Sequence, residues 1–162
     1  TMNLKIKYRE SFRPFAPSVR AENISEYFEI DRESPYMLLV ASIQKEKQIE
    51  ISDEKKSYFG LEKLNLVRSE VPAVTHVDYS ARIQSVNRIT KLRYHKLLTK
   101  FNDKYDCPMI VNTSFNIRGE PIVCTPEDAY LCFMRTQMDY LIIGNYLLDK
   151  NEQIKLSNKL AP

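Results

Sequence analysis

The apolar runs of this 162-residue chain are no longer than a β-strand, and they alternate with segments of helical period. The run YMLLVA at 36–41 has the length of a strand, whereas the apolar residues of 90–105 recur at the spacing of an amphipathic helix. No stretch of about 18 apolar residues occurs, so we expect no transmembrane helix. The alternation predicts one domain of the α/β or α+β class with a mainly mixed sheet.

Hydrophobic periodicity and turn residues place the other elements. The predicted helices are 21–28, 90–105 and 125–136, and the predicted strands are 34–43, 71–77 and 120–123. Residues 107–116 are predicted as a strand that runs into a polar turn, and 139–150 as a hairpin of two strands with a turn at Gly144–Asn145. Thr90 can cap the helix of 90–105, and Thr125 followed by Pro126 is typical of a helix start. The strand of 34–43 is apolar along its length, which favours a buried strand.

Two polar segments stand apart from these elements. The segment 44–70 is rich in lysine, and its length is typical of a lid or a disordered loop, so we expect a flexible excursion with little structure of its own. A plain solvated loop is the alternative. The tail 151–162 is polar and is expected to fray, which leaves 1–150 as the domain.

The net charge of +3 is low for a protein that binds nucleic acid. The distribution of charge is nevertheless uneven, because five cations and a single acid lie in the first twenty residues: Lys5, Lys7, Arg9, Arg13, Arg20 and Glu10. Such a local excess of positive charge can bind an anion even when the overall balance is close to neutral.

The three cysteines cannot all pair, and they follow no metal-binding spacing. With no secretory signal at the start, they predict reduced thiols in a cytoplasmic protein. The two histidines, His76 and His95, are too few and too far apart for a zinc site, so we expect no metal held by the protein itself.

The first candidate cluster is the stretch KYRESFRPFAPSVR at 7–20, which combines cations with two prolines and two phenylalanines. The prolines are incompatible with a helix interior, and a disordered basic arm would not need the aromatic rings. We therefore expect Lys7, Arg9 and Arg13 to be held in place for an oxyanion, since arginine presents a planar fork to phosphate or carboxylate. A surface arm with basic side chains reaching into water is the alternative.

The second cluster, THVDYSARIQSV at 75–86, places His76, Asp78, Ser80 and Arg82 two residues apart. If the segment is extended, these four side chains share one face, because alternate residues of a strand point to the same side. Such a face could bind a ligand, or it could simply be solvated.

The third cluster lies in VNTSFNIRGEPIV at 111–123, where an apolar strand ends in Asn112, Thr113, Ser114 and Asn116. Ligands of α/β sheets bind beyond the carboxyl ends of strands, where hydroxyls and amides can hold a phosphate or a sugar. A turn stabilised by its own side chains is the alternative. The chain contains neither a phosphate loop of the GxxxxGKS kind nor a GxSxG nucleophile motif.

Together these stretches resemble the carboxy-terminal domain of the carbamoyltransferase family, which includes nodulation and antibiotic-tailoring O-carbamoyltransferases. The matching segments occur in the family's order: KYRESFRPFAPSV (7–19), VPAVTHVDYSARIQSV (71–86) and CPMIVNTSFNIRGEPIVCTPEDAY (107–130). The resemblance implies a YrdC-like fold, with a twisted mixed sheet, flanking helices and a concave basic cavity.

The resemblance also implies a reaction. The domain would bind ATP, with Mg²⁺ on the nucleotide, together with carbamoyl phosphate, and would form carbamoyl-adenylate. A second domain that resembles actin-like ATPases would then pass the carbamoyl group to a hydroxyl of the acceptor. This sequence contains no counterpart of that domain, so we expect the transfer domain to be a partner, in cis or in trans.

The family's motifs assign roles to particular residues. Lys7 and Arg13 match its Lys/Arg pair and would bind phosphate, and Arg82 matches the arginine of its Asp-Gly-Thr-Ala-Arg stretch and would neutralise the leaving phosphates. Ser114 and Asn116 match its Ser-x-Asn motif and would bind the adenylate. The further residues expected to contact substrate or nucleotide are Arg9, His76, Asp78, Ser80, Asn112 and Thr113.

The chain departs from the family at Tyr79 and Ser80, where the family usually has glycine and threonine. Serine keeps the hydroxyl, but tyrosine adds bulk where glycine can let the backbone approach a ligand. Two other functions therefore stay open: a non-catalytic RNA- or anion-binding module, and an inactive docking domain in which Tyr79 blocks the pocket. The low net charge, and cations that are not interleaved with stacking aromatics, argue against RNA.

Overall fold

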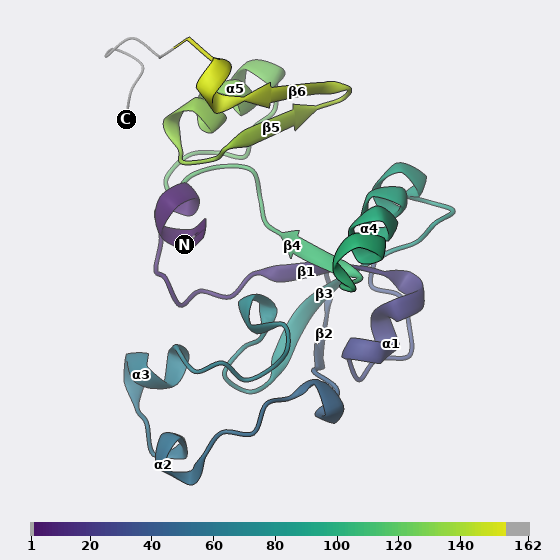
Figure 1. Ribbon diagram of the computed structural model, residues 1–162, viewed down its shortest axis with the longest axis vertical. Coiled ribbons are helices and arrows are strands. Elements are labelled where there is room, and N and C mark those ends of the chain that lie inside the picture. The colour runs from purple at the N-terminus through teal and green to yellow at the C-terminus, as the bar shows by residue number, and fades with distance from the viewer. Residues whose placement is uncertain (1, 155–162) are drawn as a thin grey trace. The chain divides into compact units, whose positions relative to one another are not determined.

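The computed structural model describes residues 2–154, and the chain forms two compact units. The sheet unit consists of Pro14–Thr113. The split unit combines the residues before Pro14 with the chain from Ser114 onward. Figure 1 shows the elements of both units, which we describe one unit at a time.

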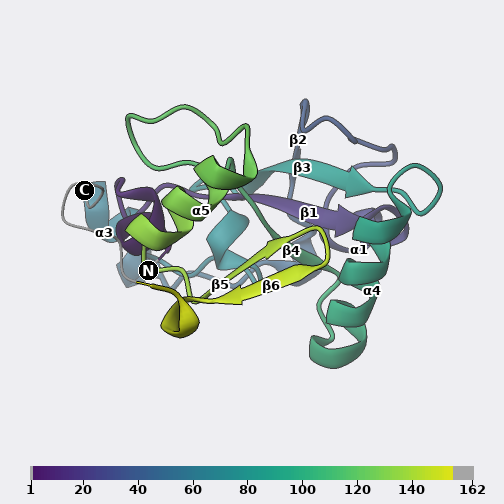
Figure 2. The same cartoon turned by 90° about the horizontal axis from the view of Figure 1, so that it is seen from above.

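A four-stranded mixed sheet, with the order β2-β3-β1-β4, forms the centre of the sheet unit. Its strands are β1 (Ala16–Arg20), β2 (Leu39–Ser42), β3 (Ser80–Val86) and β4 (Met109–Asn112). β1 pairs with β3 in parallel and with β4 antiparallel, and β2 pairs with β3 antiparallel. The parallel pair runs side by side in Figure 2. The predicted mixed sheet is thus confirmed.

Two helices accompany this sheet. α1 (Ile24–Tyr27) follows a 3₁₀ turn at Ala21–Asn23, and α4 (Leu92–Tyr105) packs against β1 and β4. The core of the unit contains buried side chains from the strands, α1 and the loops: Val19, Ile24, Tyr27, Phe28, Ile43, Val74, Ala81, Ile83 and Met109. The helices predicted at 21–28 and 90–105 are therefore confirmed.

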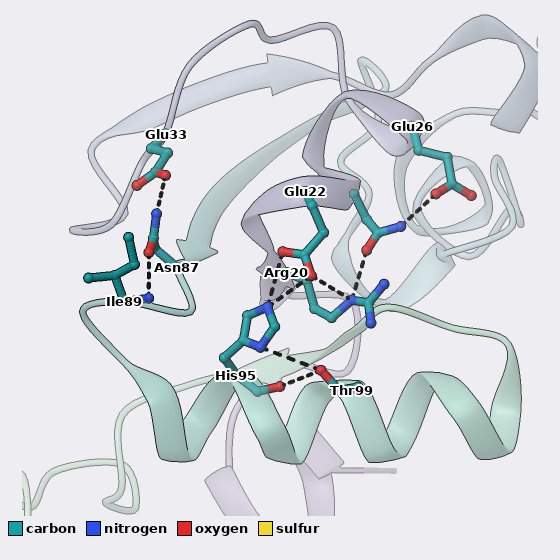
Figure 3. A network of polar contacts seen from close by, with 9 residues as sticks. Arg20, Glu22, Glu26, Glu33, Asn87, Ile89, His95 and Thr99 are labelled. Atoms are coloured by element: carbon teal, nitrogen blue, oxygen red, sulfur yellow. Dashed lines mark hydrogen bonds and ion pairs between the residues drawn. The ribbon is translucent and has the colours of Figure 1, made fainter.

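A polar network joins α4 to the turn after β1 (Figure 3). The buried ring of His95 places Nε2 2.9 Å and 3.1 Å from the two carboxylate oxygens of Glu22. The same carboxylate lies 3.5 Å from Nε of Arg20, which also donates to Oδ1 of Asn23. His95 thus has a structural role that fixes the position of α4.

The split unit contains a π-helix at Asn3–Lys7, α5 (Pro126–Arg135) and a hairpin of β5 (Tyr140–Ile143) and β6 (Tyr146–Asp149). Its small core contains Ala129, Phe133 and Leu141. α5 begins with a reciprocal capping box between Thr125 and Asp128, which confirms the helix start expected at Thr125. The predicted helix at 125–136 and the predicted hairpin at 139–150 are both confirmed, and β5 and β6 run side by side in both views.

The prediction of a buried strand at 34–43 is wrong in two respects. The strand covers only Leu39–Ser42, and it lies at the edge of the sheet, where the side chain of Val40 is 62% exposed. Met37 has a φ of 58°, so the chain is not extended before the strand begins.

Three other local predictions are also wrong. The segment 71–77 forms a 3₁₀ helix at Pro72–Val74, and 120–123 is not a strand. In each segment a proline lacks the N–H that a ladder requires. Lys91 occupies the N-cap position of α4 with no side-chain cap, so Thr90 does not cap that helix.

The excursion 44–70 has more local structure than its composition predicts. It contains a 3₁₀ turn at Lys45–Lys47 and two short helices, α2 (Asp53–Lys56) and α3 (Gly60–Leu64). Of the predicted tail 151–162, the first residues belong to a 3₁₀ turn at Lys150–Glu152, and 155–162 lie outside the described residues. Within residues 2–154 no helix has the length and apolar character needed to cross a membrane.

The capping box gives a test of the helix assignments. We expect Thr125→Ala to lower the free energy of unfolding by about 1 kcal/mol, because two backbone donors of α5 lose their acceptors or their orientation. Thr90→Ala is the matched control and should leave stability within about 0.5 kcal/mol of wild type. Urea denaturation followed by circular dichroism measures both, and equal losses would contradict the assignment.

Candidate anion-binding site

A cavity of about 200 Å³ in the split unit brings together residues from the start and the middle of the chain. Its lining contains four cations and one carboxylate: Lys7, Arg9, Glu10, Arg13, Ser114, Asn116, Ile117 and Arg118. The first and third sequence clusters therefore meet in one pocket, and the predicted oxyanion residues Lys7, Arg9 and Arg13 lie together with the Ser-x-Asn residues.

The side chain of Lys7 is the centre of this pocket. The residue is only 5% exposed, and its Nζ donates to the backbone oxygens of Ser114 at 2.8 Å and Asn116 at 2.6 Å. It also donates to Oδ1 of Asn116 at 2.7 Å and lies 3.3 Å from Oγ of Ser114. These acceptors satisfy the three N–H groups of the ammonium but carry no negative charge.

The charge of Lys7 is consequently not neutralised by any carboxylate among the described residues. Burial lowers the pKa of the Lys7 ammonium, and the neighbouring guanidinium of Arg9 lowers it further. An anion in the pocket would relieve both effects, because it would supply the missing counter-charge.

The Ser-x-Asn residues are held in place by their own hydrogen bonds. Oγ of Ser114 donates to Oδ1 of Asn116 at 2.7 Å, and Nδ2 of Asn116 donates to the backbone oxygen of Glu120 at 2.9 Å. Oδ1 of Asn116 therefore accepts from both Lys7 and Ser114. This arrangement fixes the amide and the hydroxyl before a ligand arrives.

The arginines of the pocket are organised by two residues that the sequence did not reveal as important. Buried Asn3 accepts from Nε of Arg9 at 2.7 Å and donates to the backbone oxygens of Ser11 and Arg13. Glu10 lies 3.8 Å from the guanidinium of Arg13 and 3.4 Å from that of Arg118.

Sequence reasoning thus missed three residues of the site: Asn3, Glu10 and Arg118. Asn3 precedes the basic stretch, and a short polar residue outside a motif gives no indication of its role. Glu10 and Arg118 lie inside the segments that resemble the family, so the sequence could place them near the site. It could not predict that they form an ion pair.

The second sequence cluster lies in the sheet unit, and its expected shared face exists only in part. β3 begins at Ser80, so the side chains of Ser80 and Arg82 point to the same face of the strand. His76 and Asp78 precede the strand. Oδ1 of Asp78 accepts from the Ser80 hydroxyl at 2.7 Å and from its backbone N–H at 3.1 Å. These hydrogen bonds lower the pKa of the Asp78 carboxyl and close a tight turn around Tyr79.

Asn112 and Thr113 also belong to the sheet unit. Nδ2 of Asn112 donates to Oε1 of Gln84 at 2.7 Å, and the same oxygen accepts from the buried hydroxyl of Ser18. Asn112 therefore joins β4 to β3 through their side chains, and Thr113 directly follows β4.

The sequence of this chain is similar to that of a known protein family. Residues 1–150 match the family described as the carbamoyltransferase C-terminus. The chain belongs to this family. The resemblance drawn from the three stretches is thereby confirmed.

The relatives of this carbamoyltransferase-family chain include three of different names. It is 61% identical to the uncharacterized protein sll1178 of Synechocystis over 94% of the chain, which is 25% of that protein. It is 36% identical to nodulation protein NolNO of Sinorhizobium fredii over 92% of the chain and 19% of NolNO. It is 30% identical to the 3'-hydroxymethylcephem-O-carbamoyltransferase of Amycolatopsis lactamdurans over 87% of the chain and 23% of that protein. The chain therefore spans a quarter or less of these relatives.

Tyr79, which follows Asp78, has a backbone conformation that favours glycine. Tyr79 has a φ of 62°, in the left-handed region that glycine adopts without steric cost. Tyrosine there is strained by its Cβ.

We expect Tyr79→Gly to be more stable than Tyr79→Ala by about 1 kcal/mol, because alanine keeps the Cβ that opposes the left-handed conformation. Both variants lose the same ring, so the comparison isolates the backbone strain. Thermal and urea unfolding of the two variants measure the difference. An alanine variant as stable as the glycine variant would show that the turn is not strained.

Proposed function

We propose that this chain is the activating domain of an O-carbamoyltransferase, which binds ATP and carbamoyl phosphate and forms carbamoyl-adenylate on a YrdC-like fold. The observation that carries the proposal is the buried ammonium of Lys7, bound by neutral oxygens of Ser114 and Asn116 in a pocket with Arg9 and Arg13. Family membership supports the class of reaction.

The residues of this pocket fit a phosphate group. Four cations against one carboxylate give an excess of positive charge, and guanidinium forks suit phosphate oxygens. A volume of about 200 Å³ is smaller than the roughly 300–1,000 Å³ of a site for a whole drug-sized ligand. The pocket therefore suits a phosphate portion of the substrates rather than a complete nucleotide.

The described residues offer no group of three or more His, Cys, Asp or Glu side chains that could hold a metal. Mg²⁺ usually binds through one or two carboxylates together with substrate phosphates. In this proposal the metal therefore arrives with ATP and is held mainly by the phosphate oxygens, where it supplies positive charge.

The protein's contribution to the chemistry is positioning and charge stabilisation. Loss of inorganic phosphate from carbamoyl phosphate to water leaves carbamate, whose oxygen attacks the α-phosphorus of ATP while the bond to pyrophosphate breaks. Negative charge grows on the phosphate oxygens during this step, and Lys7 and Arg13 would stabilise it. Arg82 would neutralise the leaving phosphates, and Ser114 and Asn116 would bind the adenylate.

In this proposal the acceptor hydroxyl binds to a separate transfer domain and not to this chain. The three relatives above are about four to five times as long as the matched segment, and one is named for carbamoyl transfer to a hydroxymethylcephem. A transfer domain of the actin-like ATPase type, in cis or in trans, would accept the carbamoyl group from the adenylate and pass it to a hydroxyl.

Exchange of labelled pyrophosphate into ATP tests this function directly. We expect exchange that requires carbamoyl phosphate and Mg²⁺, and we expect Arg13→Ala to reduce it by at least about 100-fold, as for the loss of one charge-stabilising donor. The side chain of Arg13 is 60% exposed, so the variant should fold.

Arg93→Ala, on the exposed surface of α4, is the control and should leave the exchange rate unchanged. Full exchange in Arg13→Ala would contradict the role given to this arginine. ATP binding without exchange in wild type would show that the partner domain is needed, and absence of both would favour the anion-binding or docking alternative.

A further inference from the structure

The lysine-rich segment of the sheet unit encloses a second cavity, of about 830 Å³. Its walls come from the excursion 44–70 and from the turn before β3, and the residues that matter here are Lys45, Ile49, Lys55, Lys63, Leu66, Arg68, Val77 and Tyr79. A volume of this size falls in the range of small-molecule sites in proteins, roughly 300–1,000 Å³.

The walls of this cavity carry an excess of positive charge. Five cations line it against two carboxylates, Glu50 and Asp53. Asp53 is paired with Lys56 at 2.6 Å, which leaves Lys45, Lys55 and Lys63 without an ion pair or side-chain hydrogen bond within residues 2–154. Three unpaired ammonium groups around one hollow favour the binding of an anion.

Arg68 is the most informative residue of the wall. It is only 4% exposed, and its guanidinium donates to the backbone oxygens of Leu66, at 2.9 Å, and Lys63. No carboxylate within the described part of the chain lies at ion-pair distance from it. Buried charges are normally paired, because neutral carbonyls do not compensate for the loss of water. A buried and uncompensated guanidinium therefore points to an anionic ligand.

Most of the uncharged lining is apolar or aromatic, with Gln48 and Ser52 as its polar members. Ile49, Leu66, Val77 and Tyr79 lie in the lining. An aromatic ring and aliphatic side chains bind an apolar or planar body, whereas the cations bind a charged head. The two kinds of wall together describe an amphipathic anion.

The base of the excursion is fixed, so the cavity is part of the folded unit. Gln48 pairs with Ser69 in an antiparallel bridge, and backbone hydrogen bonds of 2.7 Å and 3.1 Å flank it. The buried hydroxyl of Ser69 also lies 2.7 Å from that of Thr75. These contacts hold the two ends of the excursion together.

We propose that this cavity binds a small organic phosphomonoester with an apolar or aromatic body. The phosphate lies among Lys55, Lys63 and Arg68, and the body lies against Tyr79 and its aliphatic neighbours. Lys55, Lys63 and Arg68, which would bind the phosphate, are not among the residues assigned to carbamoyl activation, so their role holds or fails independently of that function.

Phenyl phosphate is a suitable probe, with phenol and inorganic phosphate as its two halves. In a ¹H–¹⁵N NMR titration of the full chain, we expect saturable shifts within 45–79, including the Arg68 side-chain Nε–H. Inorganic phosphate should bind more weakly, and phenol should cause no shift of Arg68.

The double variant Lys55→Gln, Lys63→Gln should weaken binding of phenyl phosphate at least about five-fold, because two exposed charge contacts are lost. Lys96→Gln, Lys100→Gln on α4 removes the same charge elsewhere and should bind like wild type.

Two results would overturn the proposal. One is the absence of saturable binding at millimolar phenyl phosphate. The other is binding that survives in the Lys55→Gln, Lys63→Gln variant but disappears in Arg13→Gln, which would place the ligand in the pocket of the split unit. Both lysines are exposed, so their replacement should not unfold the chain, and an unchanged NMR spectrum outside 45–79 verifies this.

Discussion

The split unit depends on one contact, the buried ammonium of Lys7 against the turn at Ser114 and Asn116. It joins residues 107 positions apart in the chain. The oxygens around Nζ accept its hydrogen bonds but do not neutralise its charge. Burial without a counter-charge is unfavourable for a cation. The fold thus holds a positive charge at the base of a small pocket, with more cations at the rim. A phosphate would complete this arrangement.

The same physical constraint recurs in the sheet unit with different residues. Arg68 is buried against backbone carbonyls, and the larger cavity that it lines also contains unpaired lysines, aliphatic side chains and Tyr79. A small pocket suits a phosphate group, whereas the larger cavity has room for an entire small molecule. The low net charge of +3 conceals both features, because their cations are balanced by acids elsewhere in the chain.

Local signals in the sequence predicted well what depends on neighbouring residues. The helix start at Thr125, the periodicity of α4 and the β5–β6 hairpin are all encoded within a few turns of chain. The segments 34–43 and 71–77 were misread, because strand boundaries depend on the partner strand and on backbone conformations such as that of Met37.

The candidate site shows the same division. The motif resemblance brought Lys7 together with Ser114 and Asn116, and the structure places them in contact. Asn3 and Arg118 were not predicted, since their roles are side-chain hydrogen bonding and charge pairing across the folded unit. Such contacts follow from tertiary structure and leave no spacing pattern in a single sequence.

The most direct measurement is the pKa of the Lys7 ammonium, by NMR of ¹³Cε-labelled lysine in the free chain and with pyrophosphate bound. We expect a pKa below the ordinary lysine value of about 10.4 in the free chain, because burial disfavours the cation. We expect pyrophosphate to raise this pKa, since the anion supplies the missing counter-charge. An ordinary pKa in the free chain, or one that pyrophosphate leaves unchanged, would contradict the claim that Lys7 is held ready for a phosphate.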